Sequence, residues 1–194
     1  MARIEILVEE QSAAVCLKEL LPQIVPEGWV YGENYFIVEH QGKQDLQRSL
    51  RNKTKAYNKW FEPIAVVVLQ DKDGNDCKQL KREILDIIGE VKYPHLVRIV
   101  CTELEAWFLG DMDAISMAYP KFKSEQYKER AKYRDPDHLG AKEELKRILP
   151  EYSEIRSSKE ISKYLDIGNN RSQSFRQFVM GVKKIFKTID PSAY

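Results

Sequence analysis

Long apolar runs are missing from this sequence, and none approaches the ~20 residues that a membrane-spanning helix needs. The first residues lead directly into a strand-like pattern and lack the apolar core of a signal peptide. The three cysteines, Cys16, Cys77 and Cys101, are far apart along the chain and include no Cys-x-x-Cys pair. We therefore expect a cytoplasmic protein with reduced thiols, and neither a disulfide framework nor a zinc site.

Several catalytic motifs are also absent. His40, His95 and His138 are scattered without the spacing of metal ligands. The chain has no Gly-x-x-x-x-Gly-Lys-Ser/Thr loop, so it is not itself a P-loop ATPase. It has no Gly-x-Ser-x-Gly elbow either, which leaves a serine hydrolase without support.

The composition is that of a soluble globular protein, because hydrophobic residues make up 43% and charged residues 31% of the 194. The net charge of +1 hides an asymmetry. Residues 1–120 have 14 Lys/Arg against 19 Asp/Glu, whereas residues 121–194 have 17 against 11. An acidic front half and a basic back half suit a metal site beside a phosphate-binding surface. The alternative is a solvated helical surface that leans basic.

Apolar patterns that alternate between strand and helix indicate the fold. The predicted strands are residues 4–8, 29–38, 64–69 and 96–100, and the predicted helices are 12–25, 43–60, 76–88 and 104–117, with Asp76 as a helix cap. This order predicts an α/β fold with a parallel sheet covered by helices. Helices predicted over 141–149, 158–165 and 172–189 follow. We divide the chain into an α/β domain over 1–120 and a helical appendage over 121–194 that packs on it.

Acidic residues follow the predicted strands at the edge where α/β proteins bind ligands. Glu9 follows the first strand, and Asp71-x-Asp73-Gly74 ends the third. If these strands are neighbours, the three carboxylates converge, and they suit Mg²⁺ or Mn²⁺ as hard oxygen ligands. Gly74 allows a sharp turn there. The alternatives are a polar loop that caps the strand and, for Glu9, a surface carboxylate near a helix N-terminus.

Further charged residues are weaker candidates. Glu103 and Glu105 follow the fourth strand and could add a metal ligand, with Asp111 a lesser choice. The alternative for these acids is to cap helices or to pair with Lys132 or Arg134. Five basic residues are candidates for phosphate binding, although each taken singly could be a solvated surface charge. They are Lys43, Lys81, Lys132, Arg134 and Arg171.

The chain as a whole resembles one branch of the bacterial domain of unknown function 4276 family, which is classed as Toprim-like. The matching stretches are Val8 to Ser12, Leu20 to Pro22, Gln41 to Leu46, Asp71 to Cys77, Glu103 to Asp111, Tyr119-Pro120, Lys132 to Asp137 and Asn170 to Phe175. The more distant resemblance to overcoming-lysogenization-defect nucleases implies a Rossmann-like sheet. It also implies that Glu9, Asp71 and Asp73 are catalytic and hold Mg²⁺ for phosphodiester chemistry. Glu10 stands where Toprim proteins usually have glycine, and its side chain could crowd a phosphate or add a ligand.

Two functions follow from this pattern and resemblance. The first is a Mg²⁺- or Mn²⁺-dependent nuclease or phosphodiesterase that acts on nucleic acid; the resemblance implies a role in phage defence beside a P-loop ATPase. The second is a non-catalytic Toprim-like module that binds such an ATPase or a nucleic acid, with Trp60, Trp107, Phe108 and Tyr119 available for an interface or for the core. Small-molecule phosphotransfer is a third possibility, because an acidic site does not specify a polymer.

Overall fold

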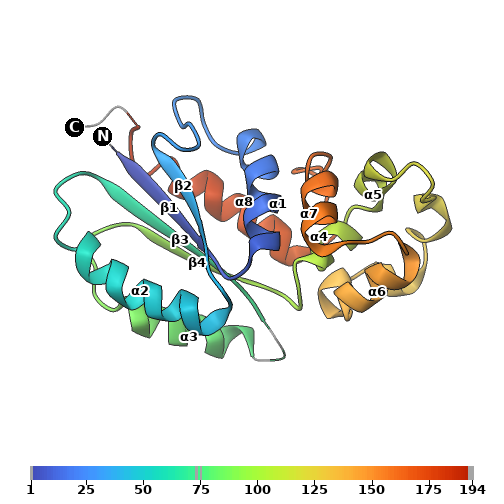
Figure 1. Ribbon diagram of the computed structural model, residues 1–194, viewed down its shortest axis with the longest axis horizontal. Coiled ribbons are helices and arrows are strands. Elements are labelled where there is room, and N and C mark those ends of the chain that lie inside the picture. The colour runs from blue at the N-terminus through green and yellow to red at the C-terminus, as the bar shows by residue number, and fades with distance from the viewer. Residues whose placement is uncertain (1, 73, 75, 192–194) are drawn as a thin grey trace.

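A parallel four-stranded sheet forms the centre of the computed structural model, which describes residues 2–72, 74 and 76–191 (Figure 1). Its strands are β1 (Arg3–Val8), β2 (Tyr35–Glu39), β3 (Ile64–Asp71) and β4 (His95–Val100), in the order β2-β1-β3-β4. The predicted α/β fold with a helix-covered parallel sheet is therefore confirmed. The first and third strands are direct neighbours, as the convergence of their acidic ends requires.

The two faces of the sheet are covered by different helices. In Figure 1, α2 (Lys43–Tyr57) and α3 (Cys77–Ile88) lie side by side below the sheet, where α2 contacts β1 and α3 contacts β4, and Leu46 and Leu80 belong to one buried apolar cluster. The other face carries α1 (Gln11–Leu20), the short helix η1 (Leu21–Gln23) and α8 (Gln173–Ile185). Because both faces are covered, β3 is a continuous run of buried β-branched and apolar residues.

The predicted helix over 104–117 is wrong as a single element. The chain instead forms α4 (Glu105–Leu109) and α5 (Met112–Ala118), with a break at Gly110. The backbone of the 170–172 segment approaches closely there: the Arg171 N–H donates to the Gly110 carbonyl at 2.9 Å, and a Cβ on Gly110 would lie 2.1 Å from Oδ1 of Asn170. Asp111 then begins α5 by accepting a hydrogen bond from the Ala114 N–H at 3.1 Å.

The C-terminal part is helical, as predicted. It contains three short helices, η2 (Ser124–Gln126), η3 (Ala131–Tyr133) and η4 (Pro136–His138), followed by α6 (Ala141–Ile148), α7 (Glu154–Ser162) and α8. α7 begins four residues earlier than predicted, and α8 ends four residues earlier. None of the helices in the described part of the chain is long and apolar enough to cross a membrane.

One apolar core joins the two parts into which the sequence was divided. Trp107 from α4 is fully buried, and its ring centroid lies 5.3 Å from that of Phe175 and 5.0 Å from that of Phe178, both in α8. Its Nε1–H donates to Oγ of Ser174 at 2.9 Å. The boundary at residue 120 remains a prediction, but the residues that follow it complete the core of those that precede it.

Candidate metal centre at the carboxyl edge of the sheet

Glu9 lies directly after β1 and is held from both sides. The Asp71 N–H, at the end of the neighbouring β3, donates to Glu9 Oε2 at 3.3 Å, while the Gly42 N–H donates to the Glu9 carbonyl at 3.0 Å. Its exposed fraction is 6%. The Nδ1 atom of His40 hydrogen-bonds to the Val8 carbonyl at 2.9 Å, which fixes the turn from β2 to α2 beside Glu9. Glu9 is therefore a positioned carboxylate in contact with the end of β3.

Asp71 is the last residue of β3 and is half-buried. The chain then turns through Gly74, whose φ of 74° favours glycine, into Asp76. The predicted helix cap at Asp76 is confirmed, because its carboxylate accepts from the Gln79 N–H at 2.8 Å and α3 starts at the next residue. Asp73 lies outside the described residues. The structure thus brings together Glu9 and the Asp71 backbone, and the contribution of Asp73 stays a prediction.

A hollow of about 380 Å³ opens beside this loop. Its described lining includes Lys72, Gly74, Thr102 and Glu103 from the strand ends, together with residues 138–140 before α6. Thr102 has a φ of 63°, a conformation that non-glycine residues rarely adopt and that is more frequent at functional sites. The same residue's Oγ1 is buried without a hydrogen-bond partner in the described structure.

A second buried polar group, the side chain of Gln70, lies near the end of β3, the strand next to β4. The side chain of Gln70 is 1% exposed, and within the described residues neither its Nε2 nor its Oε1 has a hydrogen-bond partner. Gln70 stands between Leu69, which pairs with Val8, and Asp71, so it is level with Glu9 in the sheet. Six residues of the described structure have such unpartnered buried atoms, and two of the six, Gln70 and Thr102, adjoin the acidic edge. Sequence reasoning did not select either as a site residue; the available signal was a polar side chain at or near the end of a buried strand.

The two remaining acidic candidates have structural partners. Glu103 lines the hollow, and its Oε2 accepts from the Lys142 N–H at 2.8 Å, in the first turn of α6. Glu105 is 3% exposed and accepts a hydrogen bond from the Tyr152 hydroxyl. Burial raises the pKa of Glu105 above its ordinary value, which disfavours the carboxylate that a metal needs. Glu103 thus lies at the rim of the hollow, whereas Glu105 is anchored among the helices.

The donor chemistry at this edge suits a divalent cation with a largely hydrated shell. Within residues 2–72, 74 and 76–191, no cluster of three or more His, Cys, Asp or Glu is arranged to hold a metal ion. Mg²⁺, however, is commonly bound by one or two carboxylates, with water and substrate phosphate filling the other positions. Glu9 and Asp71 are two carboxylate residues at this edge, which is the number that this smaller requirement needs, and the Asp71 N–H holds the Glu9 side chain there. The residues present therefore fit Mg²⁺ or Mn²⁺.

The five predicted phosphate-binding residues do not form one group of solvated cations. Lys132 forms an ion pair with Glu144 at 2.7 Å, Arg171 binds the Lys128 carbonyl and Glu129, and Lys43 is 3.9 Å from Glu83. Arg134 is exposed between η3 and η4, and Lys81 is half-buried on α3. Their role stays a prediction, and Lys132 and Arg171 have clear structural partners.

Glu144, the partner of Lys132, provides a test of this helical region. The hydrogen bonds from Arg147, at 2.6 and 3.1 Å, and those from Lys132 and Tyr133 lower the pKa of Glu144 to about 2. Its contribution to stability is thus present above its ordinary pKa of 4.5 and is lost as the pH falls through about 2. We expect Glu144→Gln to lower the free energy of unfolding at pH 7 by about 1–2 kcal/mol, since its partners are partly solvated.

Urea unfolding at pH 7 and at pH 3 measures this effect. The difference in unfolding free energy between the wild type and Glu144→Gln should be smaller at pH 3 than at pH 7. At pH 3 the Glu144 carboxylate begins to protonate, which reduces its stabilising effect in the wild type. Glu143→Gln is the control, as Glu143 is 82% exposed and pairs with Lys146 at the surface. An equal loss in both variants, or a difference that widens in acid, would contradict the assigned network.

Two of the three cysteines lie close to the acidic edge. The Sγ atoms of Cys77, at the start of α3, and Cys101, after β4, are 3.4 Å apart. All three cysteines are free in this structure. Burial and the neighbouring thiol raise the pKa of Cys101 to about 12, so it stays protonated at neutral pH. Their separation in sequence gave no sign of this contact, which depends on β3 and β4 being neighbours.

Comparison with known proteins adds a family. No curated protein and no solved structure matches the chain significantly. The family model described as "Domain of unknown function (DUF4276)" matches residues 8–183. This match includes Glu9 and Asp71, and it runs across both the sheet and the C-terminal helices. The chain therefore belongs to the DUF4276 family.

Proposed function

We propose that this protein is a Toprim-like, metal-dependent phosphodiesterase that cleaves nucleic acid in the cytoplasm. The observation that carries the proposal is the meeting of Glu9 with the Asp71 backbone at adjacent ends of parallel strands, where Oε2 and N are 3.3 Å apart. Ligand sites of open α/β sheets lie at this edge. The resemblance of the Glu9 and Asp71-x-Asp73 pattern to Toprim proteins supports the same reading, and it also motivates a role in phage defence.

The chain's own residues would divide the work as follows. Glu9, Asp71 and Asp73 would hold Mg²⁺ or Mn²⁺, and Glu103 lines the hollow that opens beside the loop after β3. A bound divalent cation supplies Lewis-acid stabilisation of phosphoryl oxygens and lowers the pKa of a bound water. Glu105 is less suited to this set, because its pKa is raised by burial and its oxygen is bound by Tyr152.

Cationic and neutral donors in the hollow fit a phosphate group. The hollow is lined by Lys72, whose charge is opposite to that of a phosphodiester. Thr102 also lines the hollow, and its buried Oγ1 has no hydrogen-bond partner among the described residues. The α3 helix begins six residues after Asp71, and its N-terminus contributes a further positive potential toward this edge.

Cleavage assays test the proposal directly. Purified protein is incubated with single-stranded DNA, linear duplex DNA, plasmid and RNA, with Mg²⁺, with Mn²⁺ or with EDTA. We expect cleavage of at least one polymer with metal and none with EDTA. Absence of cleavage of every polymer, with Mn²⁺ still raising the thermal midpoint, would instead support the non-catalytic binding module. Absence of both effects would refute the site.

A further inference from the structure

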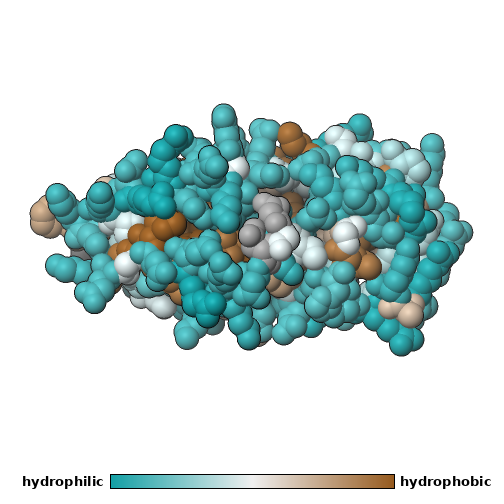
Figure 2. Space-filling model, turned by 90° about the horizontal axis from the view of Figure 1, so that it is seen from below, coloured by the Kyte–Doolittle hydropathy of each residue, from teal (hydrophilic) through white to brown (hydrophobic). Residues whose placement is uncertain are grey.

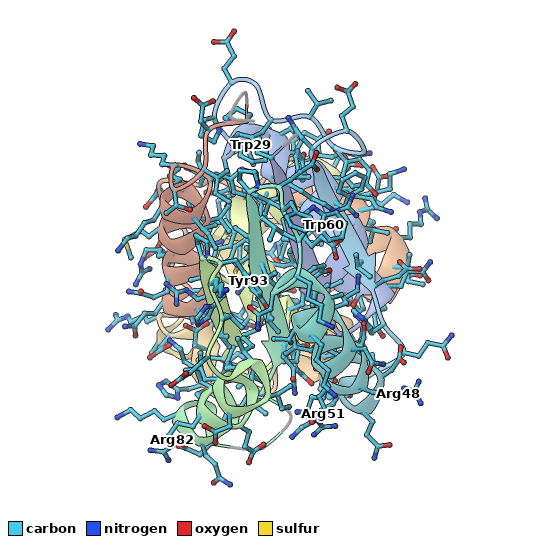
Figure 3. All side chains as sticks on the ribbon, turned by 90° about the vertical axis from the view of Figure 1, so that its left-hand side faces the viewer. Trp29, Arg48, Arg51, Trp60, Arg82 and Tyr93 are labelled. Atoms are coloured by element: carbon cyan, nitrogen blue, oxygen red, sulfur yellow. The ribbon has the colours of Figure 1, made fainter. Side chains whose placement is uncertain are left out.

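The α2 helix carries a stripe of cations along the face that points away from the sheet. Residues 43–59 contain six Lys/Arg and one acidic residue, within the half of the chain that is acidic as a whole. Arg48, Arg51 and Lys55 follow one another at spacings of three and four, which places them on one helical face, and all three are exposed. Lys59 extends the row just beyond the helix. In Figure 3, Arg48 and Arg51 project from the outer side of α2.

Most of these cations are not neutralised by the protein. Arg48 pairs with Asp45 at 2.6 Å, which is the one acid in the segment. Within the described residues, Arg51, Lys55 and Lys59 form no ion pair. Lys53 differs, because it turns inward and binds the buried carboxylate of Glu5 at 2.8 Å. Lys53 thus serves the fold, Lys43 and Arg48 each have an acidic neighbour, and Arg51, Lys55 and Lys59 face solvent.

The neighbouring helix extends this surface. Lys78 and Arg82 are exposed on α3, one turn apart, and Figure 3 shows Arg82 on the same side of the molecule as Arg48 and Arg51. Figure 2 shows the molecule from below the view of Figure 1, which is the side on which α2 and α3 lie. This surface is largely hydrophilic, with a strip of apolar side chains between polar ones. A membrane-bound helix needs an apolar face of its own on the outside. The apolar face of α2, with Leu46 and Leu50, is instead buried against the sheet.

The stripe of cations has the acidic sheet edge at one end and two exposed aromatic residues at the other. Gly42, immediately before α2, donates its N–H to the Glu9 carbonyl, so the stripe begins beside the acidic edge. From there to Lys59 the helical rise is about 25 Å. Two aromatic residues follow at once: Trp60 is 43% exposed and Phe61 is fully exposed. Exposed aromatic rings that follow a row of cations are the stacking platforms by which proteins bind single strands.

We propose that the outer face of α2 is a binding track for single-stranded nucleic acid. Arg51, Lys55 and Lys59 contact successive phosphates, and Phe61, with Trp60, stacks on a base at the far end. The track deepens the proposed function, since it rests on the acidic edge as the cleavage site and names the substrate as a polymer strand. It does not coincide with the five phosphate-binding residues expected from the sequence, except that Lys43 lies at its start.

A matched pair of triple variants tests the track. Arg51→Gln/Lys55→Gln/Lys59→Gln removes three cations from α2, and Lys183→Gln/Lys184→Gln/Lys187→Gln removes three exposed cations from α8 and its end. Binding of labelled oligothymidylate and of a duplex is measured by fluorescence anisotropy in EDTA, so that cleavage does not interfere. The α2 variant should bind the single strand at least tenfold more weakly. The slope of its log affinity against log salt should fall by about 2.

Further binding measurements distinguish a single strand from a duplex and from a membrane surface. Phe61→Ala should weaken binding to the single strand about fivefold or more and binding to the duplex much less, because stacking needs an unpaired base. Equal losses in the α2 and α8 triple variants would show a net-charge effect and overturn the track. Equal or tighter binding of vesicles with anionic lipid would overturn it in favour of a membrane surface.

The outcomes separate the track from the cleavage site. Metal-dependent cleavage that survives the α2 substitutions with unchanged affinity would refute the track and leave the proposed function standing. Loss of binding in the α2 variant, with no cleavage by the wild type, would support the track and refute the proposed function.

Discussion

Asp71→Asn is expected to reduce metal-dependent cleavage by about 100-fold or more, since even residues that merely support metal ligands are worth about 10–100-fold. The substitution removes the charge of a carboxylate at the end of β3 and leaves the backbone N–H that binds Glu9. Glu9→Gln should reduce cleavage to the same extent, because it also removes a negative charge from the site. Its amide oxygen can still accept the hydrogen bond from the Asp71 N–H, so the local fold should be kept. Initial cleavage rates over a range of Mg²⁺ concentrations measure the loss.

Stability without metal distinguishes a lost ligand from a damaged fold. Carboxylates gathered at one sheet edge repel each other when no cation is bound, so Asp71→Asn should unfold at the same or a higher temperature in EDTA. Asp86→Asn, on the exposed side of α3, is the control and should retain full activity. An Asp71→Asn variant that cleaves like the wild type would remove this residue from the site.

Trp107→Ala is expected to cost about 3–5 kcal/mol of unfolding free energy, the range for a large buried aromatic. The side chain is fully buried, packs on Phe175 and Phe178, and donates to Ser174, so its removal opens a cavity and breaks a buried hydrogen bond. Urea unfolding measures the loss. Trp60→Ala is the matched control. Because Trp60 is 43% exposed, this substitution should lower the unfolding free energy by less than about 1 kcal/mol.

The same experiment examines the union of the two parts of the chain. Since Trp107 precedes residue 120 and its partners lie in α8, both parts should unfold together in one transition, in the wild type and in Trp107→Ala. Two separate transitions, or a loss no larger than that of Trp60→Ala, would contradict the shared core.

Local patterns in the sequence predicted the sheet well. The β-branched run of β3 and the N-cap at Asp76 are determined by neighbouring residues, and both are confirmed. The break at Gly110 could not be predicted in this way, because its cause is the approach of Asn170 and Arg171 from sixty residues away. The contact between Cys77 and Cys101 depends likewise on strand order.

The site was predicted only in part for a related reason. Glu9 and the end of β3 meet because their strands are neighbours, which the β-α order favoured. The hydrogen-bond donors that hold the other two carboxylates come from segments far away in the sequence. Tyr152 donates to Glu105, and the Lys142 N–H donates to Glu103. The net charge of residues 1–120 hides the α2 stripe, because the cations of α2 stand out only at helical spacing.

Direct metal binding is the sharpest test of the central claim that Glu9 and Asp71 belong to one cation site. Calorimetric titration with Mn²⁺ should show saturable binding to the wild-type protein, and binding should be lost in Glu9→Gln and in Asp71→Asn but kept in Asp86→Asn. Equal binding by all four proteins would place the cation elsewhere. No binding by the wild type, in the presence or absence of oligothymidylate, would contradict the metal centre itself.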